Sequence, residues 1–408
     1  MTRAHRRCMI GMVAFMAAIP IGVSAQPAAY RPGVEVLLRD SLSLLAGRRV
    51  GLITNPSGRD RAGRSTIDLL FHAPGVRLVA LFGPEHGLRG TAQAGETVAS
   101  TRDSATGLPI YSLYGADRVP TPTALDSIDV LVYDIQDVGA RVYTYEWTMA
   151  LSAEAAGRAH KPFVVLDRPD PIRGDVVQGG VLDTAFRSFV GQFPVAMRYG
   201  LTPGELMRWL VGTGRMSVEL HVIPMEGWRR GMWWDATGTP WQNPSPNLRA
   251  MDALALYPGM VFFEGTNLSE GRGTEAPFQL VGAAWLTDAG AIARELNALR
   301  LPGVRFDSTA RTIERGQKWG GATIPMLHVT VRDRDALNPV VVGAHMLRAI
   351  YARHPRAFEW NASIDRLFGG TRLRDAVSRE GGIEALLPEL EVESRAFADS
   401  TRRYWLYH

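Results

Sequence analysis

The chain has 408 residues, which exceeds the size of one typical hydrophobic core and predicts two domains. Hydrophobic residues make up 46% of it and charged residues 21%, as in ordinary globular proteins. The formal net charge is only +4 and no run of basic residues stands out, which argues against a nucleic-acid partner.

The first 25 residues are typical of a secretory signal peptide. A positively charged start precedes an apolar stretch over residues 9–23, and Val23-Ser24-Ala25 is similar to a cleavage site. We expect cleavage after Ala25, export to the periplasm or the outside, and no stable membrane insertion afterwards; an uncleaved anchor is the alternative. The only cysteine, Cys8, would leave with this segment, so the rest of the chain has no thiol for disulfides, nucleophilic catalysis or metal binding.

Residues 31–167 alternate between segments with helix signals and continuous apolar runs. Helices are expected near residues 31–45, 65–71, 120–127 and 145–160. Buried strands are expected at residues 50–54, 76–82, 129–134 and 163–167, with a short extended piece at 110–111. This alternation predicts an α/β fold with a Rossmann-like, doubly wound, mainly parallel sheet. A dinucleotide-binding G-x-G-x-x-G loop is absent after the first strand, so we expect no cofactor.

Polar residues follow three of these strands, all of which would end at one edge of a parallel sheet: Glu85 and His86, then Asp134 with Gln136 and Asp137, then Asp167 with Arg168. In an open α/β sheet, ligands bind just beyond the carboxyl ends of the strands. We therefore expect a cleft at this edge, where Gly83 and Gly87 allow close approach of the backbone to a ligand. The alternative is that these residues are ordinary helix caps and solvated turn residues.

The middle of the chain contains a helix near residues 202–210, a strand near 220–224, and a long loop over 225–257 with four tryptophans. Those aromatic rings could form a platform for a glycan or a satellite core. A strand is expected at 261–264, ending on Glu264, followed by a glycine-rich segment at 265–274 that is typical of a substrate loop. That segment supplies Asn267, Glu270 and Arg272.

From about residue 283 a smaller α+β domain is expected. Its helices would lie near 289–299 and 340–354, its strands near 304–306 and 327–331, and short helices would form the tail. The expected organisation is therefore a signal peptide at 1–25, a catalytic domain at 26–282 and an auxiliary domain at 283–408.

Several long motifs resemble one known family, the NamZ-type exo-β-N-acetylmuramidases. They are residues 51–56, 81–90, 94–96, 113–115, 134–145, 165–169, 244–247, 264–274 and 402–404. The resemblance implies removal of terminal N-acetylmuramic acid from the non-reducing ends of peptidoglycan fragments. It also implies a Rossmann-like catalytic domain with a smaller C-terminal domain, and it places the family's catalytic glutamate at Glu85.

Glycoside hydrolysis generally requires one carboxyl group to protonate the leaving oxygen, and a second group to activate water, attack the sugar or stabilise charge. We assign Glu85 as the general acid and expect Glu264 or Glu270 as the second group, with Asp134 and Asp137 in reserve. Sugar hydroxyls or a water would be held by His86, Gln136 and Tyr145, with Asn267 beside them. The lactyl carboxylate of muramic acid would pair with Arg141, Arg168 or Arg272.

Two alternative functions fit the same residues. One is a non-catalytic protein that binds cell-wall glycans. The other is metal-assisted hydrolysis of a related amino sugar, with Glu85, His86, Asp134 and Asp137 as ligands, although our assignment includes no metal site.

The chain also departs from the family pattern at four positions. Tyr199 replaces a histidine, Ala276 a basic residue, Gln279 a common glutamate and Arg249 a proline. A different amino sugar or a modified muramic acid is therefore an alternative substrate.

Overall fold

The computed structural model describes residues 29–88, 101–115 and 118–408. The expected signal peptide with its cleavage site after Ala25, the lone Cys8 and the family motif at 94–96 lie outside these residues. Within the described part of the chain, no helix combines the length and the apolar character that crossing a membrane requires.

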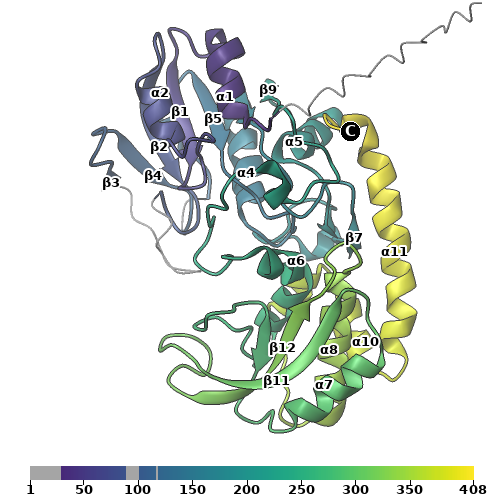
Figure 1. The fold of residues 1–408 in the computed structure, drawn as a ribbon. Coiled ribbons are helices and arrows are strands. Elements are labelled where there is room, and N and C mark those ends of the chain that lie inside the picture. The colour runs from purple at the N-terminus through teal and green to yellow at the C-terminus, as the bar shows by residue number, and fades with distance from the viewer. Residues whose placement is uncertain (1–28, 89–100, 116–117) are drawn as a thin grey trace, which may run out of the picture.

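The N-terminal part is built on a seven-stranded sheet with the order β3-β4-β2-β1-β5-β6-β9 (Figure 1). All neighbours in this sheet pair in parallel except β3 and β4. The strands are β1 (Arg49–Thr54), β2 (Arg77–Gly83), β3 (Thr101–Arg102), β4 (Pro109–Ser112), β5 (Val130–Asp134), β6 (Phe163–Leu166) and β9 (Leu220–Ile223). The predicted α/β fold with a mainly parallel sheet is thus confirmed.

Both faces of this sheet are buried, which explains why its strands are apolar without alternation. On one face, Val50 and Leu52 of β1 pack in a cluster with Leu37 from the N-terminal helical segment. On the other face, Ile53 belongs to the large core that includes Met149 of α4. Side chains of one strand therefore serve two separate cores, as in a doubly wound fold.

The predicted helices of this part are present. Residues 33–44 form one helical segment of three types: α1 (Gly33–Val36), a π-helical turn (Leu37–Ser41) and a 3-10 turn (Leu42–Leu44). The remaining helices are α2 (Thr66–Phe71), α3 (Pro122–Asp126), α4 (Tyr145–Arg158) and α5 (Pro203–Gly212). The expected cap is confirmed at α2, where the Ser65 hydroxyl accepts a hydrogen bond from the Asp68 amide at 3.1 Å.

The C-terminal part is smaller and contains an antiparallel sheet of order β10-β12-β11 (Figure 1). Its strands are β10 (Leu280–Gly282), β11 (Val304–Thr312) and β12 (Thr323–Val331), and its helices are α7 (Ala289–Ala298), α8 (Pro339–Arg353), α9 (Ile364–Phe368), α10 (Arg372–Val377) and α11 (Gly382–Thr401). β10 ends at 282, where we expected the first domain to end, yet it pairs with β12 of the second sheet.

The expected short helices of the tail are present as α9 and α10, but they are followed by one 20-residue helix, α11. It continues through Pro388 because Leu386, Leu390 and Phe397 are buried along it, and this packing outweighs the low helix propensity of proline. In Figure 1 the helix runs along the side of the molecule and connects the C-terminal part with the N-terminal part.

The strand expected at 261–264 is wrong. Helix α6 (Met251–Met260) leads directly into a 3-10 helix (Val261–Gly265), so Glu264 lies on a helical turn. Val261, Phe262 and Phe263 are all buried, and a short run that is apolar on every side has no periodicity to separate helix from strand. Two short strands were also missed, β7 (Gln178–Val181) and β8 (Ala196–Arg198).

The tryptophan-rich segment forms a satellite core rather than a glycan platform. Trp228, Trp233 and Trp234 are each no more than 5% exposed. Trp228 packs edge-on against Tyr407 with ring centres 5.2 Å apart, so the segment fastens the C-terminal residues to the N-terminal part.

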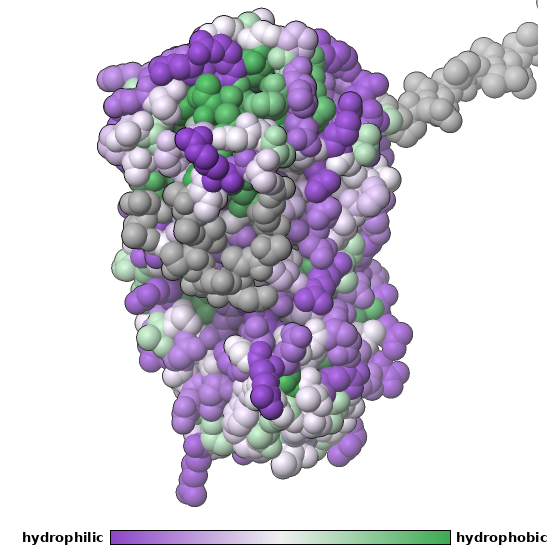
Figure 2. Space-filling view, turned by 90° about the vertical axis from the view of Figure 1, so that its left-hand side faces the viewer, coloured by the Kyte–Doolittle hydropathy of each residue, from purple (hydrophilic) through white to green (hydrophobic). Residues whose placement is uncertain are grey.

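On the face of the molecule shown in Figure 2, the apolar residues cluster over the N-terminal part, and the surface of the C-terminal part is mainly hydrophilic.

Candidate active site

A pocket of about 330 Å³ is lined by residues from both parts of the chain. Four of the predicted site residues line it, namely Glu85, His86, Glu264 and Arg272. The remaining lining residues are Tyr114, Arg118, Val142, Tyr143, Thr144, Phe189, Val190, Ser245, Asn247, Leu248, Tyr257 and Phe278. A larger cavity of about 860 Å³ lies beside residues 55–72, but no predicted catalytic residue lines it. The smaller pocket is therefore the candidate active site.

Glu85 lies two residues beyond the end of β2, on the turn that begins at Gly83. A Cβ atom on Gly83 would lie 3.0 Å from the backbone nitrogen of Leu88, so this turn is tight. The Thr144 hydroxyl donates a hydrogen bond to Oε2 of Glu85 at 2.7 Å. The turn after β2 and the start of α4 together orient this carboxyl group at the pocket.

His86 and Tyr145 support the same turn in different ways. His86 is buried and adopts a left-handed backbone conformation, with φ of 68°, which is uncommon for a residue with a side chain. The Tyr145 hydroxyl lies 2.6 Å from the Pro244 carbonyl oxygen and 3.3 Å from that of Glu85. Tyr145 thus contacts the backbone of the turn and does not line the pocket.

Glu264 belongs to a chain of alternating charges. Its carboxylate forms an ion pair with Arg272, whose Nε lies 3.1 Å from Oε1 of Glu270. Lys318 continues the chain, with Nζ 2.9 Å from the other oxygen of Glu270. Burial raises the pKa of Glu264, and the positive charge of Arg272 opposes that rise. Glu270 does not line the pocket, and its ion pair with Arg272 connects it to the pocket lining.

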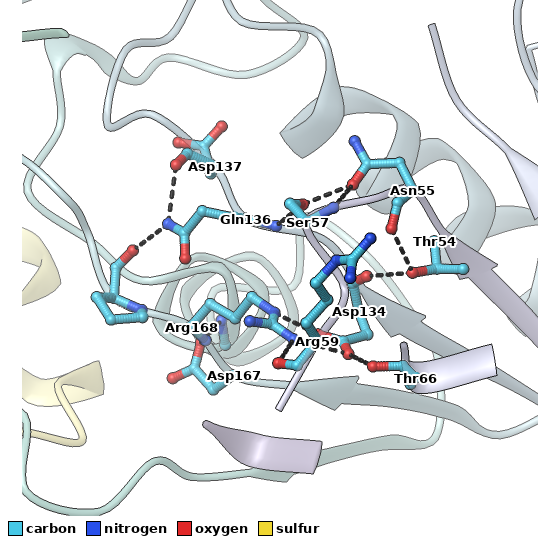
Figure 3. A network of polar contacts seen from close by, with 12 residues as sticks. Thr54, Asn55, Ser57, Arg59, Thr66, Asp134, Gln136, Asp137, Asp167 and Arg168 are labelled. Atoms are coloured by element: carbon cyan, nitrogen blue, oxygen red, sulfur yellow. Dashed lines mark hydrogen bonds and ion pairs between the residues drawn. The ribbon is translucent and has the colours of Figure 1, made fainter. Parts of the chain in front are cut away.

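Asp134 and Arg168 form a buried ion pair away from the pocket (Figure 3). Their side chains are 0% and 3% exposed. The carboxylate of Asp134 also accepts a hydrogen bond from Thr66, and Arg168 donates to the Arg59 carbonyl oxygen at 2.9 Å. The pair therefore ties together the loops that follow β1, β5 and β6.

Gln136 and Asp137 belong to the same sealed layer. The Gln136 amide donates to the carbonyl oxygens of Asp137 at 2.9 Å and Pro169 at 2.7 Å, as Figure 3 shows. The carboxylate of Asp137 accepts hydrogen bonds from the Gly139 amide at 2.6 Å and from the Tyr199 hydroxyl. Burial raises the pKa of Asp137 to about 7. Neither residue lines the pocket.

Arg141 and Asn267 connect segments far apart in the sequence. Arg141 is fully buried and donates to the carbonyl oxygens of Leu367 at 2.8 Å and Phe368 at 2.7 Å, so it fastens the N-terminal part to α9. Burial lowers the pKa of Arg141 to about 9. The Asn267 amide donates to the Ala357 carbonyl oxygen at 2.8 Å. Both side chains lie outside the pocket lining.

The structure adds lining residues that we did not assign from the sequence, above all Thr144, Arg118 and Asn247. Thr144 and Asn247 lie in two of the family motifs, at 134–145 and 244–247, which was the available signal for them. None of the four departures from the family pattern, at 199, 249, 276 and 279, lines the pocket. Tyr199 instead donates a hydrogen bond from its hydroxyl group to the carboxylate of Asp137.

Within the described residues, no group of three or more histidine, cysteine, aspartate or glutamate side chains could hold a metal ion. Of the four ligands named for the metal-assisted alternative, Glu85 and His86 line the pocket, whereas Asp134 and Asp137 do not.

Comparisons with known proteins cover nearly the whole described chain. A family model described as exo-beta-N-acetylmuramidase NamZ, N-terminal, matches residues 50–252, and its C-terminal counterpart matches residues 255–407. The peptidoglycan beta-N-acetylmuramidase NamZ of Bacillus subtilis (strain 168) is 39% identical over 377 residues, which cover 92% of this chain and 91% of that protein.

Two crystal structures of DUF1343 family proteins from Bacteroides fragilis NCTC 9343 have the same fold. One superposes with a TM-score of 0.86 at 36% identity and the other with 0.73 at 25% identity. In each case the match covers 93% of this chain and 99% of the solved one.

Proposed function

Because the chain belongs to the exo-β-N-acetylmuramidase NamZ family, we propose that it releases terminal β-linked N-acetylmuramic acid from peptidoglycan fragments. The relative from Bacillus subtilis is named a peptidoglycan beta-N-acetylmuramidase. The substrate, and so the partner, would be a peptidoglycan-derived glycan.

The observation that carries this proposal is that two carboxyl groups from distant segments line one pocket. Glu85 comes from the turn after β2 and Glu264 from the 3-10 helix after α6. Hydrolysis of a glycosidic bond needs two such groups on either side of the sugar. The pocket therefore holds the minimum chemistry for a glycosidase.

In this scheme the protonated carboxyl of Glu85 delivers its proton to the leaving glycosidic oxygen. The Thr144 hydroxyl fixes the orientation of that carboxyl group through Oε2. Glu264 is the second group, and Arg272 favours its ionised form. An ionised Glu264 stabilises the positive charge that develops on the sugar ring, attacks the ring or activates a water.

The decisive experiment is the digestion of a chromogenic β-N-acetylmuramide and of defined muropeptide disaccharides. Wild-type protein should release the chromophore and free N-acetylmuramic acid. Glu85→Gln should lower turnover by about 10²- to 10⁴-fold, the usual contribution of general acid catalysis, without changing the fold. Glu275→Gln is the matched control, since Glu275 pairs with Arg311 on the surface and lies outside the pocket lining.

Two outcomes would contradict the proposal. Unchanged turnover in Glu85→Gln would remove Glu85 from the mechanism. Binding of the muramide without release by wild-type protein would favour the glycan-binding alternative.

Export to the periplasm or the outside belongs to the same proposal, on the strength of residues 1–25. N-terminal sequencing of the protein from its host should find Gln26 as the first residue.

A further inference from the structure

We propose that Arg118 recognises the carboxylate of the sugar and so makes the pocket prefer acidic over neutral amino sugars. This inference rests on the proposed function. N-acetylmuramic acid differs from N-acetylglucosamine by a lactyl ether, whose carboxyl group is ionised at neutral pH. A pocket for this sugar therefore needs a positive charge that is available to the ligand.

Among the residues that the structure describes, the charges around the pocket leave few candidates for that role. Glu85 and Glu264 also line it, and two carboxylates repel an anionic sugar unless a cation compensates. Arg272 already lies between Glu264 and Glu270. Its guanidinium is committed to two carboxylates, which satisfy its charge.

The other two arginines proposed from the sequence also have protein partners, and they do not line the pocket. The guanidinium of Arg141 donates to backbone carbonyl oxygens next to α9, and that of Arg168 pairs with Asp134. Both side chains are buried outside the pocket lining. Neither can reach a sugar in the pocket.

Arg118 differs from these three in its surroundings. It lines the pocket, it is exposed, and it forms no ion pair with any residue that the structure describes. Its guanidinium carbon lies 4.5 Å from the centre of the Phe189 ring. Phe189 is itself buried and packs against Tyr114, with ring centres 6.0 Å apart.

This contact with Phe189 holds Arg118 in a position to bind a carboxylate. The guanidinium carbon lies over the Phe189 ring, and this cation–π contact limits the orientations of the side chain. The N–H groups point outward in the plane of the guanidinium, so they stay available for a bidentate contact with a carboxylate. Loss of such charge-assisted hydrogen bonds would weaken the reaction of an acidic sugar alone.

The test uses two chromogenic β-glycosides, that of N-acetylmuramic acid and that of its lactyl carboxamide, which has the same shape but no charge. Arg118→Gln should lower kcat/KM for the acid by about 10- to 100-fold, the range expected for hydrogen bonds to a charged group. It should change kcat/KM for the carboxamide by less than about twofold, and Arg118→Lys should lie between wild type and Arg118→Gln on the acid.

Arg187→Gln is the matched control. Arg187 is also an exposed arginine over an aromatic ring, with its guanidinium carbon 5.8 Å from the centre of Phe193, but it does not line the pocket. This variant removes the same charge and should leave both substrates unaffected. Equal losses on both substrates in Arg118→Gln, or an unchanged preference for the acid, would overturn the inference.

A binding measurement separates this inference from the proposed function. Calorimetry in the Glu85→Gln background compares N-acetylmuramic acid with N-acetylglucosamine. If wild-type protein hydrolyses neither glycoside, the proposed function fails, yet a preference for the acid that Arg118→Gln abolishes would still support recognition by Arg118. If binding of the acid does not depend on Arg118, the inference fails whatever the hydrolysis shows.

Discussion

Two groups of polar residues lie near the carboxyl edge of the N-terminal sheet, and they differ in what surrounds them. In the sealed network of Asp134, Gln136, Asp137 and Arg168, the side chains are buried and contact protein groups from neighbouring loops. In the pocket, Glu85 and Glu264 are only partly buried and line a cavity. The two groups therefore differ in burial: the side chains of the network are enclosed by protein, whereas those of the pocket face a cavity.

The comparison predicts a role in stability for the buried group and, under the proposed function, a role in catalysis for the pocket group. A buried charge whose partner is removed loses its compensation and destabilises the fold. Neutralising a pocket carboxyl should cost less stability, because Glu85 and Glu264 are partly exposed and Arg272 keeps a second partner in Glu270. Substitutions in the two groups should therefore change different measurements.

The largest effect is expected from Asp134→Asn. This change leaves the buried guanidinium of Arg168 without an anionic partner and should lower the free energy of unfolding by about 3–5 kcal/mol. Urea denaturation measures it. The control is Asp129→Asn, which breaks an exposed ion pair with Arg49 and should lower the free energy of unfolding far less. If Asp134→Asn and wild type had equal free energies of unfolding, the network would not be needed for stability.

The next effect concerns the second carboxyl group. Glu264→Gln should lower kcat by about 10²-fold or more, because Glu264 lines the pocket. It should change the free energy of unfolding less than Asp134→Asn does, because Arg272 keeps Glu270 as a partner. Glu270→Gln should lower kcat much less, since Glu270 acts through Arg272. Chromogenic assays of both variants rank the two residues. A larger loss in Glu270→Gln would reverse the assignment.

Counted per pH unit, the smallest effect is a pH dependence of stability from the sealed network. Burial raises the pKa of Asp137 from its ordinary 3.8 to about 7. Between these values the folded state keeps a proton that the unfolded state has lost, so this contribution is complete below about pH 4 and is lost as pH rises through 7. The free energy of unfolding should fall by about 1.4 kcal/mol per pH unit from this group.

Asp137→Asn should make that slope shallower in denaturation curves recorded between pH 5 and pH 8, and the part that stays comes from other buried acids, because burial also raises the pKa of Asp167 to about 7 and that of Asp170 to about 8. Asp129→Asn should leave the slope as it is, because Arg49 lowers the pKa of Asp129 to about 2 and the group is ionised in both states over this range. A slope in Asp137→Asn as steep as that of wild type would assign the effect to other groups.

The N-terminal fold could be predicted because its strands are buried on both faces. Continuous apolar runs such as 129–134 have no other simple interpretation when helix signals flank them. The same reasoning failed at 261–264, where a helical turn is buried on all sides and its apolar run looks the same.

The site could be predicted only where a motif marked it. Glu85 and Arg272 lie in conspicuous loops and line the pocket. Arg141 and Asn267 lie in equally conspicuous segments, but their side chains bond to the backbone of residues 357–368, which no local pattern reveals. Arg118 lies in none of the family motifs. Only its tertiary contact with Phe189 identifies it as a candidate.

The fastening of α9 by Arg141 has a consequence for catalysis. Glu85 belongs to one half of the molecule and Glu264 to the other, so their separation is set by how firmly the halves are joined. A molecule that wedged this joint open would inhibit the enzyme without touching either acid. Under the proposed function, we expect neither half alone to hydrolyse the substrate, because each carries only one of the two acids.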